Sequence, residues 1–307
     1  MPADQRLLLV HAHPDDECIG NAATMAKYVA AGRDVTLVTC TAGEMGEILV
    51  PELEHLAADK EDRLGEHRRG EIANALAVLA PGEGQSIDHR WLGGFQRFRD
   101  SGMKWHDDGY AIPADDIHDN AFWAADLTVA ADYLVEIIRE VRPQVLATYD
   151  PFGGYGHPDH IQAHRVAMYA AQLAAVPSYR RDLGAPWEIA KIYWNAMSES
   201  RMRAGLRALR DAGDTTSFEG MDPDGPLPPF VTADENLSAA VDAQEYVELK
   251  LDALRAYPTQ VTTDGPFFAL SNNVGSTAWG IEFYRIVKGE RGELGEDGLE
   301  TDLFAGV

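Results

Sequence analysis

An apolar run that ends in a polar loop and continues as a helix constrains the fold of this sequence most. Residues 6–12 are apolar enough for a buried strand, the loop HAHPDDE follows at residues 11–17, and apolar side chains then recur at helical spacing as far as Gly32. A second strand-like run occupies residues 34–40. Strand, loop, helix and strand at this spacing are typical of a βαβ unit with a parallel pair of strands. The sequence therefore predicts an α/β fold.

The alternation of strands and helices continues through most of the chain, which favours a doubly wound, mostly parallel sheet. The clearest late helix covers residues 244–257, and the Pro, Gly and Asp residues between 213 and 229 predict a linker or a long surface loop. The other predicted elements are helices at residues 60–79, 127–141, 159–174 and 199–212, and strands at residues 89–92, 145–149 and 191–195.

Charge and cysteine content exclude several classes of protein. The formal net charge of −24 repels phosphate backbones and anionic membranes, so we expect no nucleic-acid partner and no membrane partner. Residues 1–6 lack the pattern of a secretory signal, and no apolar run reaches roughly 18 residues. The two cysteines, Cys18 and Cys40, form no CxxC pair, which excludes a cysteine-rich zinc module and a disulfide framework. We expect a soluble cytoplasmic protein with two buried free thiols.

The loop at residues 11–17 carries the residue types that bind a cation. Ligands of open α/β sheets bind beyond the carboxyl ends of the strands, where this loop lies. It has imidazole and carboxylate groups in place of the GxGxxG of a dinucleotide site. His13 and Asp16 can converge on one point, while Asp15 between them must point elsewhere. The alternative is that Asp15 and Asp16 only cap a helix N-terminus, but capping does not explain His13.

A second polar motif, YGHPDH at residues 155–160, follows the predicted strand at residues 145–149. It therefore lies at the same edge of the sheet as the first motif. With His13 and Asp16, His160 would complete three ligands and leave the fourth tetrahedral position open, as in catalytic zinc sites. A pair formed by His160 and His164 is a competing ligand set, although no Glu follows His160 in the manner of a zincin. We interpret His11 as a packed histidine behind the ligands.

These motifs resemble those of a known family. HAHPDDE (residues 11–17) with GGYGHPDH (residues 153–160) is similar to the LmbE-like, PIG-L-type zinc de-N-acetylases. Residues 91–103, 257–273 and 300–306 also resemble the branch of this family that acts on N-acetylglucosaminyl-inositol in mycothiol biosynthesis. The resemblance covers nearly the whole chain, with variable stretches around residues 107–126 and 213–235.

The resemblance implies a Rossmann-like catalytic core, which we assign to residues 1–180, and a smaller C-terminal part, residues 181–307, that completes the substrate pocket. It also implies a role for each of nine side chains. Zn²⁺ would be held by His13, Asp16 and His160, Asp15 would be the general base, His157 and Tyr155 would assist the tetrahedral intermediate, Asp159 would orient His157, and Arg68 and Asp100 would hold sugar and inositol hydroxyls. An arginine on a helix face can also be simply solvated, which is the alternative for Arg68.

The implied reaction is hydrolysis of the acetamide of N-acetylglucosaminyl-inositol, a small-molecule amino-sugar substrate, to glucosaminyl-inositol and acetate. A mycothiol-conjugate amidase has the same zinc chemistry and cuts a different amide, and the motifs alone do not separate the two. A non-catalytic sugar- or metal-binding protein is the alternative from another class. Asp15 argues against it, because binding alone needs no base beside the metal.

Overall fold

A mixed sheet of eight strands is the centre of this computed structural model, which describes residues 5–262 and 279–307. The strand order is β3-β2-β1-β6-β7-β10-β9, with β8 beside β7, and a separate hairpin pairs β4 with β5. The strands are β1 (Arg6–His11), β2 (Asp34–Thr39), β3 (Ile87–Trp91), β4 (Met103–Trp105), β5 (Ala111–Pro113), β6 (Val145–Thr148), β7 (Lys191–Ser198), β8 (Val231–Thr232), β9 (Ala239–Asp242) and β10 (Ile281–Lys288).

Parallel pairing dominates the sheet, as the sequence predicts. β1 pairs in parallel with β2 on one side and with β6 on the other, so that Leu7 lies beside both Val35 and Val145. Strands in this position are covered on both faces, and a run of apolar residues is stable there. β10 is antiparallel to both β7 and β9. The predicted α/β fold with a doubly wound, mostly parallel sheet is confirmed.

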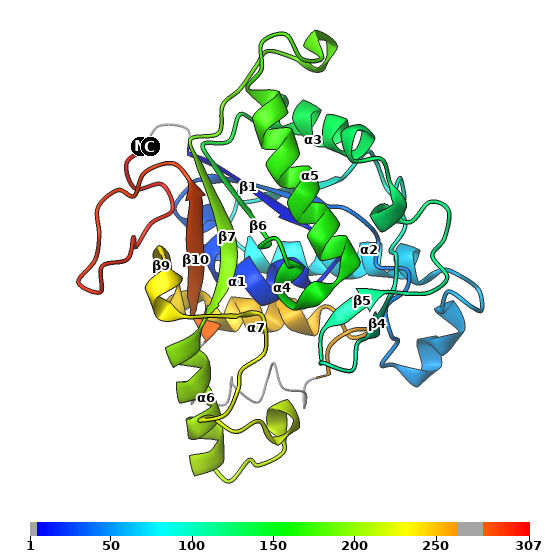
Figure 1. Cartoon of the computed structure of the whole chain (residues 1–307), viewed down its shortest axis with the longest axis vertical. Helices are drawn as coiled ribbons and strands as arrows, with labels where there is room; N and C mark the ends of the chain where they lie inside the picture. Colours follow the sequence, from blue (N-terminus) through cyan, green and yellow to red (C-terminus); the bar gives the residue numbers. More distant parts are fainter. Residues whose placement is uncertain (1–4, 263–278) are drawn as a thin grey trace.

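Helices cover both faces of the sheet (Figure 1). On one face α1, α2 and α7 pack over one apolar cluster, and on the other α3 and α5 pack over a second. The predicted surface loop contains one short 3-10 turn, and no helix within residues 5–262 or 279–307 is long and apolar enough to cross a membrane. The helices are α1 (Asp16–Ala30), α2 (Leu64–Leu79), α3 (Leu127–Val141), α4 (Gly153–Gly156), α5 (Pro158–Ala174), α6 (Glu199–Asp211) and α7 (Val247–Arg255).

The C-terminal third contributes to the same sheet as the N-terminal half. β7 continues the parallel series from β6, and β10 follows β7 in antiparallel orientation. The division at residue 180 therefore falls between two neighbouring strands of one sheet, and it stays a prediction. Of the motif at residues 257–273, residues 263–273 lie outside the described part of the chain.

Helix α1 is held by residues from the end of the chain. Glu282 on β10 accepts hydrogen bonds from the backbone amides of Ala23 and Thr24, at 3.2 and 2.8 Å, and from the buried ammonium of Lys250 at 2.7 Å. Just beyond the C-terminal end of α1, Asp302 accepts two hydrogen bonds from the guanidinium of Arg33. These contacts anchor the helix that begins at the first polar motif.

Candidate active site

The two polar motifs lie side by side at the carboxyl ends of β1 and β6. The loop after β1 leads into α1 at Asp16, and the segment after β6 leads through α4 into α5, of which His157 is the N-cap. Asp15 has a φ of 109°, a backbone conformation that side-chain-bearing residues seldom adopt. Its amide donates to the buried carboxylate of Glu17 at 3.0 Å, and Glu17 accepts from the Tyr257 hydroxyl at 2.6 Å. The strained turn is thus fixed by buried hydrogen bonds.

The structure brings the three predicted ligands together. Nδ1 of His13 lies 3.3 Å from Oδ2 of Asp16, and Nε2 of His160 lies 3.3 Å from Oδ1 of Asp16. Burial alone would raise the pKa of Asp16, but the imidazoles of His160 and His13 hold that pKa well below its usual value. Among residues 5–262 and 279–307, the buried Nε2 of His160 has no hydrogen-bond partner. A buried imidazole nitrogen without a hydrogen-bond partner, next to a carboxylate, fits the role of a metal ligand.

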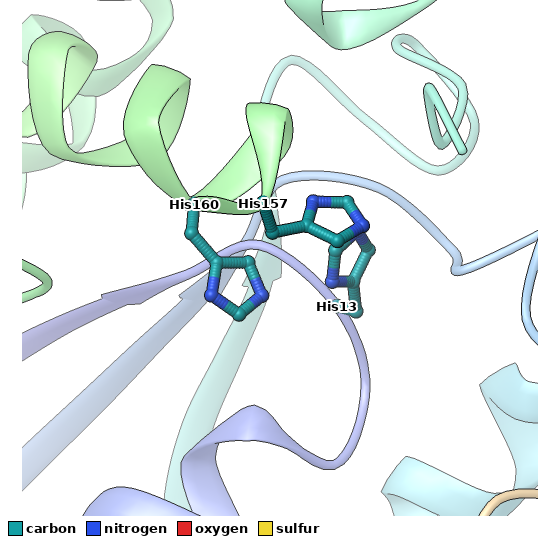
Figure 2. Close-up of side chains that lie close together, drawn as sticks. All are labelled: His13, His157 and His160. Carbon is teal, nitrogen blue, oxygen red and sulfur yellow. The ribbon is translucent and has the colours of Figure 1, made fainter. Parts of the chain in front are cut away.

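His157 belongs to the same cluster (Figure 2). His13, His157 and His160 each offer a nitrogen, and the three atoms lie within 4.8 Å of one another. The backbone amide of Asp159 donates to Nδ1 of His157 at 3.1 Å, which places the proton of a neutral His157 on Nε2. Burial, together with the neighbouring His13, lowers the pKa of His157 well below its usual value. His157 is therefore a neutral hydrogen-bond donor in the cluster.

Within residues 5–262 and 279–307, the carboxylate of Asp159 contacts His13 and Ser101, and the role of its side chain toward His157 stays a prediction. Oδ2 of Asp159 lies 3.2 Å from Nε2 of His13 and accepts the backbone amide of Ser101 at 2.9 Å, while the Ser101 hydroxyl donates to Oδ1. Asp159 thus orients His157 through its backbone and His13 through its side chain. Because a carboxylate accepts the Nε2 proton of His13, Nδ1 is left to bind a metal. Sequence reasoning missed Ser101, which lies next to Asp100 but carries no metal-ligand signal.

Arg68 is buried, at 2% exposure, so the alternative of a solvated arginine is wrong. Its guanidinium donates to the backbone carbonyls of Gly43, at 2.9 Å, and Pro14, and to Oδ2 of Asp15 at 2.9 Å. Burial raises the pKa of Asp15 to about 8, and the charge of Arg68 opposes this rise. The first structural role of Arg68 is therefore to support Asp15.

Asp100 lies beside the same nitrogen of His13 as Asp159 does, with Oδ1 3.6 Å from Nε2. Burial raises the pKa of Asp100, but the interactions with His13, His157 and the Gly102 amide together hold the pKa far below its usual value. Asp100 accepts the backbone amide of Met45 at 3.2 Å, and its own amide donates to Glu44 at 3.0 Å. Both neighbours line a cavity of about 440 Å³, whose other acidic lining residues are Glu47, Glu54 and Asp59.

Tyr155 is half-buried beside the cluster, with its ring 5.1 Å from the His160 ring and 5.9 Å from the exposed Trp105. Burial raises the pKa of Tyr155, so the phenol keeps its proton at neutral pH. Trp105 is on β4, in the hairpin that directly follows Ser101. This hairpin falls partly in the stretch that the sequence marked as variable, and its Trp105 lies against Tyr155.

The remaining histidines near the motifs face away from the ligands. Nδ1 of His164 donates to the carbonyl of Tyr149 at 2.9 Å, and its ring packs against Trp194. His11 is buried, with Nε2 2.7 Å from Asn21 Oδ1, as expected of a packed histidine. The geometry therefore favours His160 alone over the pair of His160 and His164. Cys18 and Cys40 are buried free thiols, as predicted.

An α/β sheet with a buried cluster of histidines and carboxylates at its carboxyl edge defines a protein that can hold a metal ion beside a base. Residues 8–171 match the family described as PIG-L: GlcNAc-PI de-N-acetylase. The chain belongs to this family of de-N-acetylases.

Two relatives and one solved structure extend the comparison. The proteins of Nocardioides sp. (78% identical, over 100% of both chains) and Kribbella flavida (60% identical, over 99% of this chain and 98% of the relative) are each named 1D-myo-inositol 2-acetamido-2-deoxy-alpha-D-glucopyranoside deacetylase. The N,N'-diacetylchitobiose deacetylase of Pyrococcus horikoshii superposes with a TM-score of 0.59 at 19% identity, covering 94% of this chain and 85% of that one. At this identity the likeness shows a shared fold.

Proposed function

We propose that this protein hydrolyses the acetamide of N-acetylglucosaminyl-inositol and releases glucosaminyl-inositol and acetate, a step of mycothiol biosynthesis. The observation that carries the proposal is the buried cluster of His13, Asp16 and His160 with Asp15 beside it, in a chain 78% identical to a relative named for this deacetylation. The fold alone would not define the substrate, because one fold can host unrelated reactions.

Zn²⁺ is the metal that suits the donor set. Two imidazoles and one carboxylate, with a further position open to solvent or substrate, are typical of catalytic zinc. The unsatisfied Nε2 of His160 and the Nδ1 of His13 are the nitrogens that would hold it, together with the Asp16 carboxylate. When bound, the ion supplies a Lewis acid that activates water and polarises an amide carbonyl.

Asp15 is placed to move protons. We assign it the role of the base that takes a proton from the attacking water and later delivers it to the leaving amine. Its pKa, raised by burial to about 8, lies near neutral pH, where a group can both accept and donate a proton. Arg68 holds Oδ2 and the neighbouring backbone, so the carboxylate cannot rotate freely.

The oxygen of the amide develops negative charge in the transition state, and two neutral donors lie nearby. His157 carries its proton on Nε2, and Tyr155 keeps its hydroxyl proton because burial raises its pKa. Donors fixed before the reaction stabilise such charge without reorganisation. We propose that one or both donate to this oxygen.

The substrate's hydroxyl groups need acceptors and donors at the mouth of the site. Asp100 and the acidic cavity beside it can accept hydrogen bonds from a polyol such as inositol. A contact of Arg68 with substrate hydroxyls stays a prediction. We further infer a cytoplasmic enzyme, because its two cysteines are free thiols, as is usual in a reducing compartment.

A side-by-side assay tests the proposal. Purified protein with measured zinc content is given N-acetylglucosaminyl-inositol or a bimane conjugate of mycothiol, and the released acetate and free amines are quantified. We expect a higher kcat/KM on N-acetylglucosaminyl-inositol. A preference for the conjugate would make the protein an amidase of the same family, and zinc-loaded protein inactive on both would favour a binding protein.

A further inference from the structure

The hydroxyl of Tyr149 lies behind the proposed ligands, directly after β6. It donates to Oδ2 of Asp16 at 2.7 Å and accepts the backbone amide of Ala12, the residue before His13, at 2.9 Å. Nδ1 of His11 lies 3.2 Å away from the same hydroxyl. One phenol oxygen therefore links a ligand carboxylate to the backbone that carries a ligand histidine.

The ring of Tyr149 contacts the third proposed ligand. It stacks on His160 with ring centroids 4.3 Å apart and an interplanar angle of 20°. Rotation of the His160 imidazole about its long axis would break this stacking. Tyr149 thus limits the orientation of Asp16 through its hydroxyl and the orientation of His160 through its ring.

Buried hydrogen bonds continue behind Tyr149. Nε2 of His11 lies 2.7 Å from Oδ1 of Asn21, and the Asn21 amide donates to the Tyr284 hydroxyl at 2.9 Å. His11, Asn21 and Tyr284 are each no more than 1% exposed. Water cannot readily replace these partners, so the support behind the phenol is rigid.

The carboxylate of Asp16 is held in one orientation by the Tyr149 hydroxyl and a backbone amide. Its Oδ2 accepts from two donors, the Tyr149 hydroxyl at 2.7 Å and the backbone amide of His13 at 2.9 Å. With Oδ2 held in this way, Oδ1 lies 3.3 Å from the unsatisfied Nε2 of His160. Groups that hydrogen-bond to a metal-binding carboxylate fix its orientation, and their loss typically weakens metal binding by about 10- to 100-fold.

We propose that Tyr149 is a positioning residue that sets the Asp16 carboxylate, and with it the affinity of the site for zinc. The inference rests on the proposed function, because it takes His13, Asp16 and His160 as the ligands. Tyr149 acts through Asp16, which its hydroxyl contacts, and through His160, on which its ring stacks.

Tyr284 provides a matched control. Like Tyr149 it is buried, and its hydroxyl takes part in the same buried network by donating to Thr24 at 2.8 Å and accepting from Asn21. None of the contacts that the structure gives for Tyr284 reaches His13, Asp16 or His160. Loss of this hydroxyl removes one partner of Asn21 but leaves the Tyr149 hydroxyl bonded to Asp16 and to the Ala12 amide, so it should lower stability without releasing the Asp16 carboxylate.

The experiment compares Tyr149→Phe, Tyr284→Phe, His160→Ala and the unmodified protein after removal of metal. The dissociation constant for Zn²⁺ is measured by competition with a chromophoric chelator, and thermal unfolding of the metal-free proteins reports folding. We expect Tyr149→Phe to bind zinc about 10- to 100-fold more weakly than the unmodified protein. The dissociation constant of Tyr284→Phe for Zn²⁺ should stay within about threefold of that of the unmodified protein. Both variants should melt at a lower temperature than the unmodified protein.

Three possible results distinguish the positioning role of Tyr149 from the proposed function. Unchanged zinc affinity in Tyr149→Phe, with zinc binding lost in His160→Ala, would overturn the role of Tyr149 and leave the ligands in place. Equal weakening in Tyr149→Phe and Tyr284→Phe would also overturn it, because the effect would then follow general stability. Weakened binding in Tyr149→Phe alone, in a protein that hydrolyses neither test substrate, would support the positioning role and reject the proposed reaction.

Discussion

Arg68 on helix α2 donates a hydrogen bond from Nη2 to Oδ2 of Asp15 across 2.9 Å, near the carboxyl ends of the neighbouring strands β1 and β2. The same guanidinium donates to the carbonyls of Pro14 and Gly43, so it joins the two loops that follow these neighbouring strands. A Cβ at Gly43 would lie 2.0 Å from Nη1 of Arg68, and only glycine leaves room for the arginine there. The position of Asp15 therefore depends on a side chain fifty-three residues later in the sequence.

Replacing this arginine should reduce turnover without loss of metal. Arg68→Met removes the group that positions Asp15, and we expect kcat/KM to fall by about 10²-fold, the usual cost of a misplaced catalytic group. Because the charge of Arg68 lowers the pKa of Asp15, its removal raises that pKa. The acidic limb of the profile of kcat/KM against pH should then move to higher pH in Arg68→Met. Arg69→Met, on the exposed side of the same helix, is the control, and an unshifted limb in Arg68→Met would contradict the role.

The ligand set predicts which variants lose metal. His13→Ala, Asp16→Ala and His160→Ala should each lower zinc content and activity together. His164→Ala should keep both, because its ring nitrogen bonds to the Tyr149 carbonyl and its ring faces Trp194. Metal content per chain is measured by atomic emission after dialysis. Zinc lost from His164→Ala and kept by His160→Ala would refute the assignment.

Replacing Asp15 should distinguish the role of general base from that of metal ligand. We expect Asp15→Ala to retain zinc and to lose about 10² to 10⁴ in turnover, the usual contribution of a positioned general base. Since the backbone at Asp15 has a φ of 109°, Asp15→Asn is the companion variant, because asparagine tolerates positive φ better than alanine. Turnover near that of the unmodified protein in both variants, with full zinc, would remove Asp15 from the mechanism.

Stability at mildly acidic pH should depend on His89. Burial lowers the pKa of His89 to about 4, and its Nε2 lies 3.0 Å from the Thr39 hydroxyl. A histidine whose pKa is lower in the folded state binds its proton more readily when unfolded, so it destabilises the fold as pH falls below about 6.5. The effect should grow until about pH 4. His89→Gln should flatten the loss of unfolding free energy between these two pH values, measured by urea titration. The exposed His118→Gln is the control, and an equal slope in unmodified protein and His89→Gln would contradict the prediction.

The local pattern of apolar and polar residues predicts the strands and helices that meet at the site. The helix at residues 127–141 has the predicted bounds, and β1, α1 and β6 lie within a few residues of theirs. Helix α2 begins at Leu64 in place of residue 60, because the charged residues before it form an exposed turn. Strands β9 and β10 escape prediction because β9 is short and β10 pairs with β7 across a long sequence separation.

The parts of the site that the sequence does not predict depend on contacts between segments that are distant in the sequence. The motifs identify the residue types that bind a metal, but the acceptors of the Arg68 guanidinium are backbone carbonyls of other loops, and no sequence pattern marks them. The side-chain partner of Asp159 is decided in the same way by the packing of two loops, which sets His13 beside its carboxylate.

The anchoring of α1 by Glu282 and Asp302 bears on the order of events during synthesis. His13 and Asp16 are synthesised well before Glu282 and Asp302, whose side chains fasten the helix that begins at Asp16. Domains generally fold as units once their sequence is available. We expect the metal site to mature only after Glu282 and Asp302 have been synthesised, so that a nascent chain arrested before residue 280 carries the first motif without a formed site.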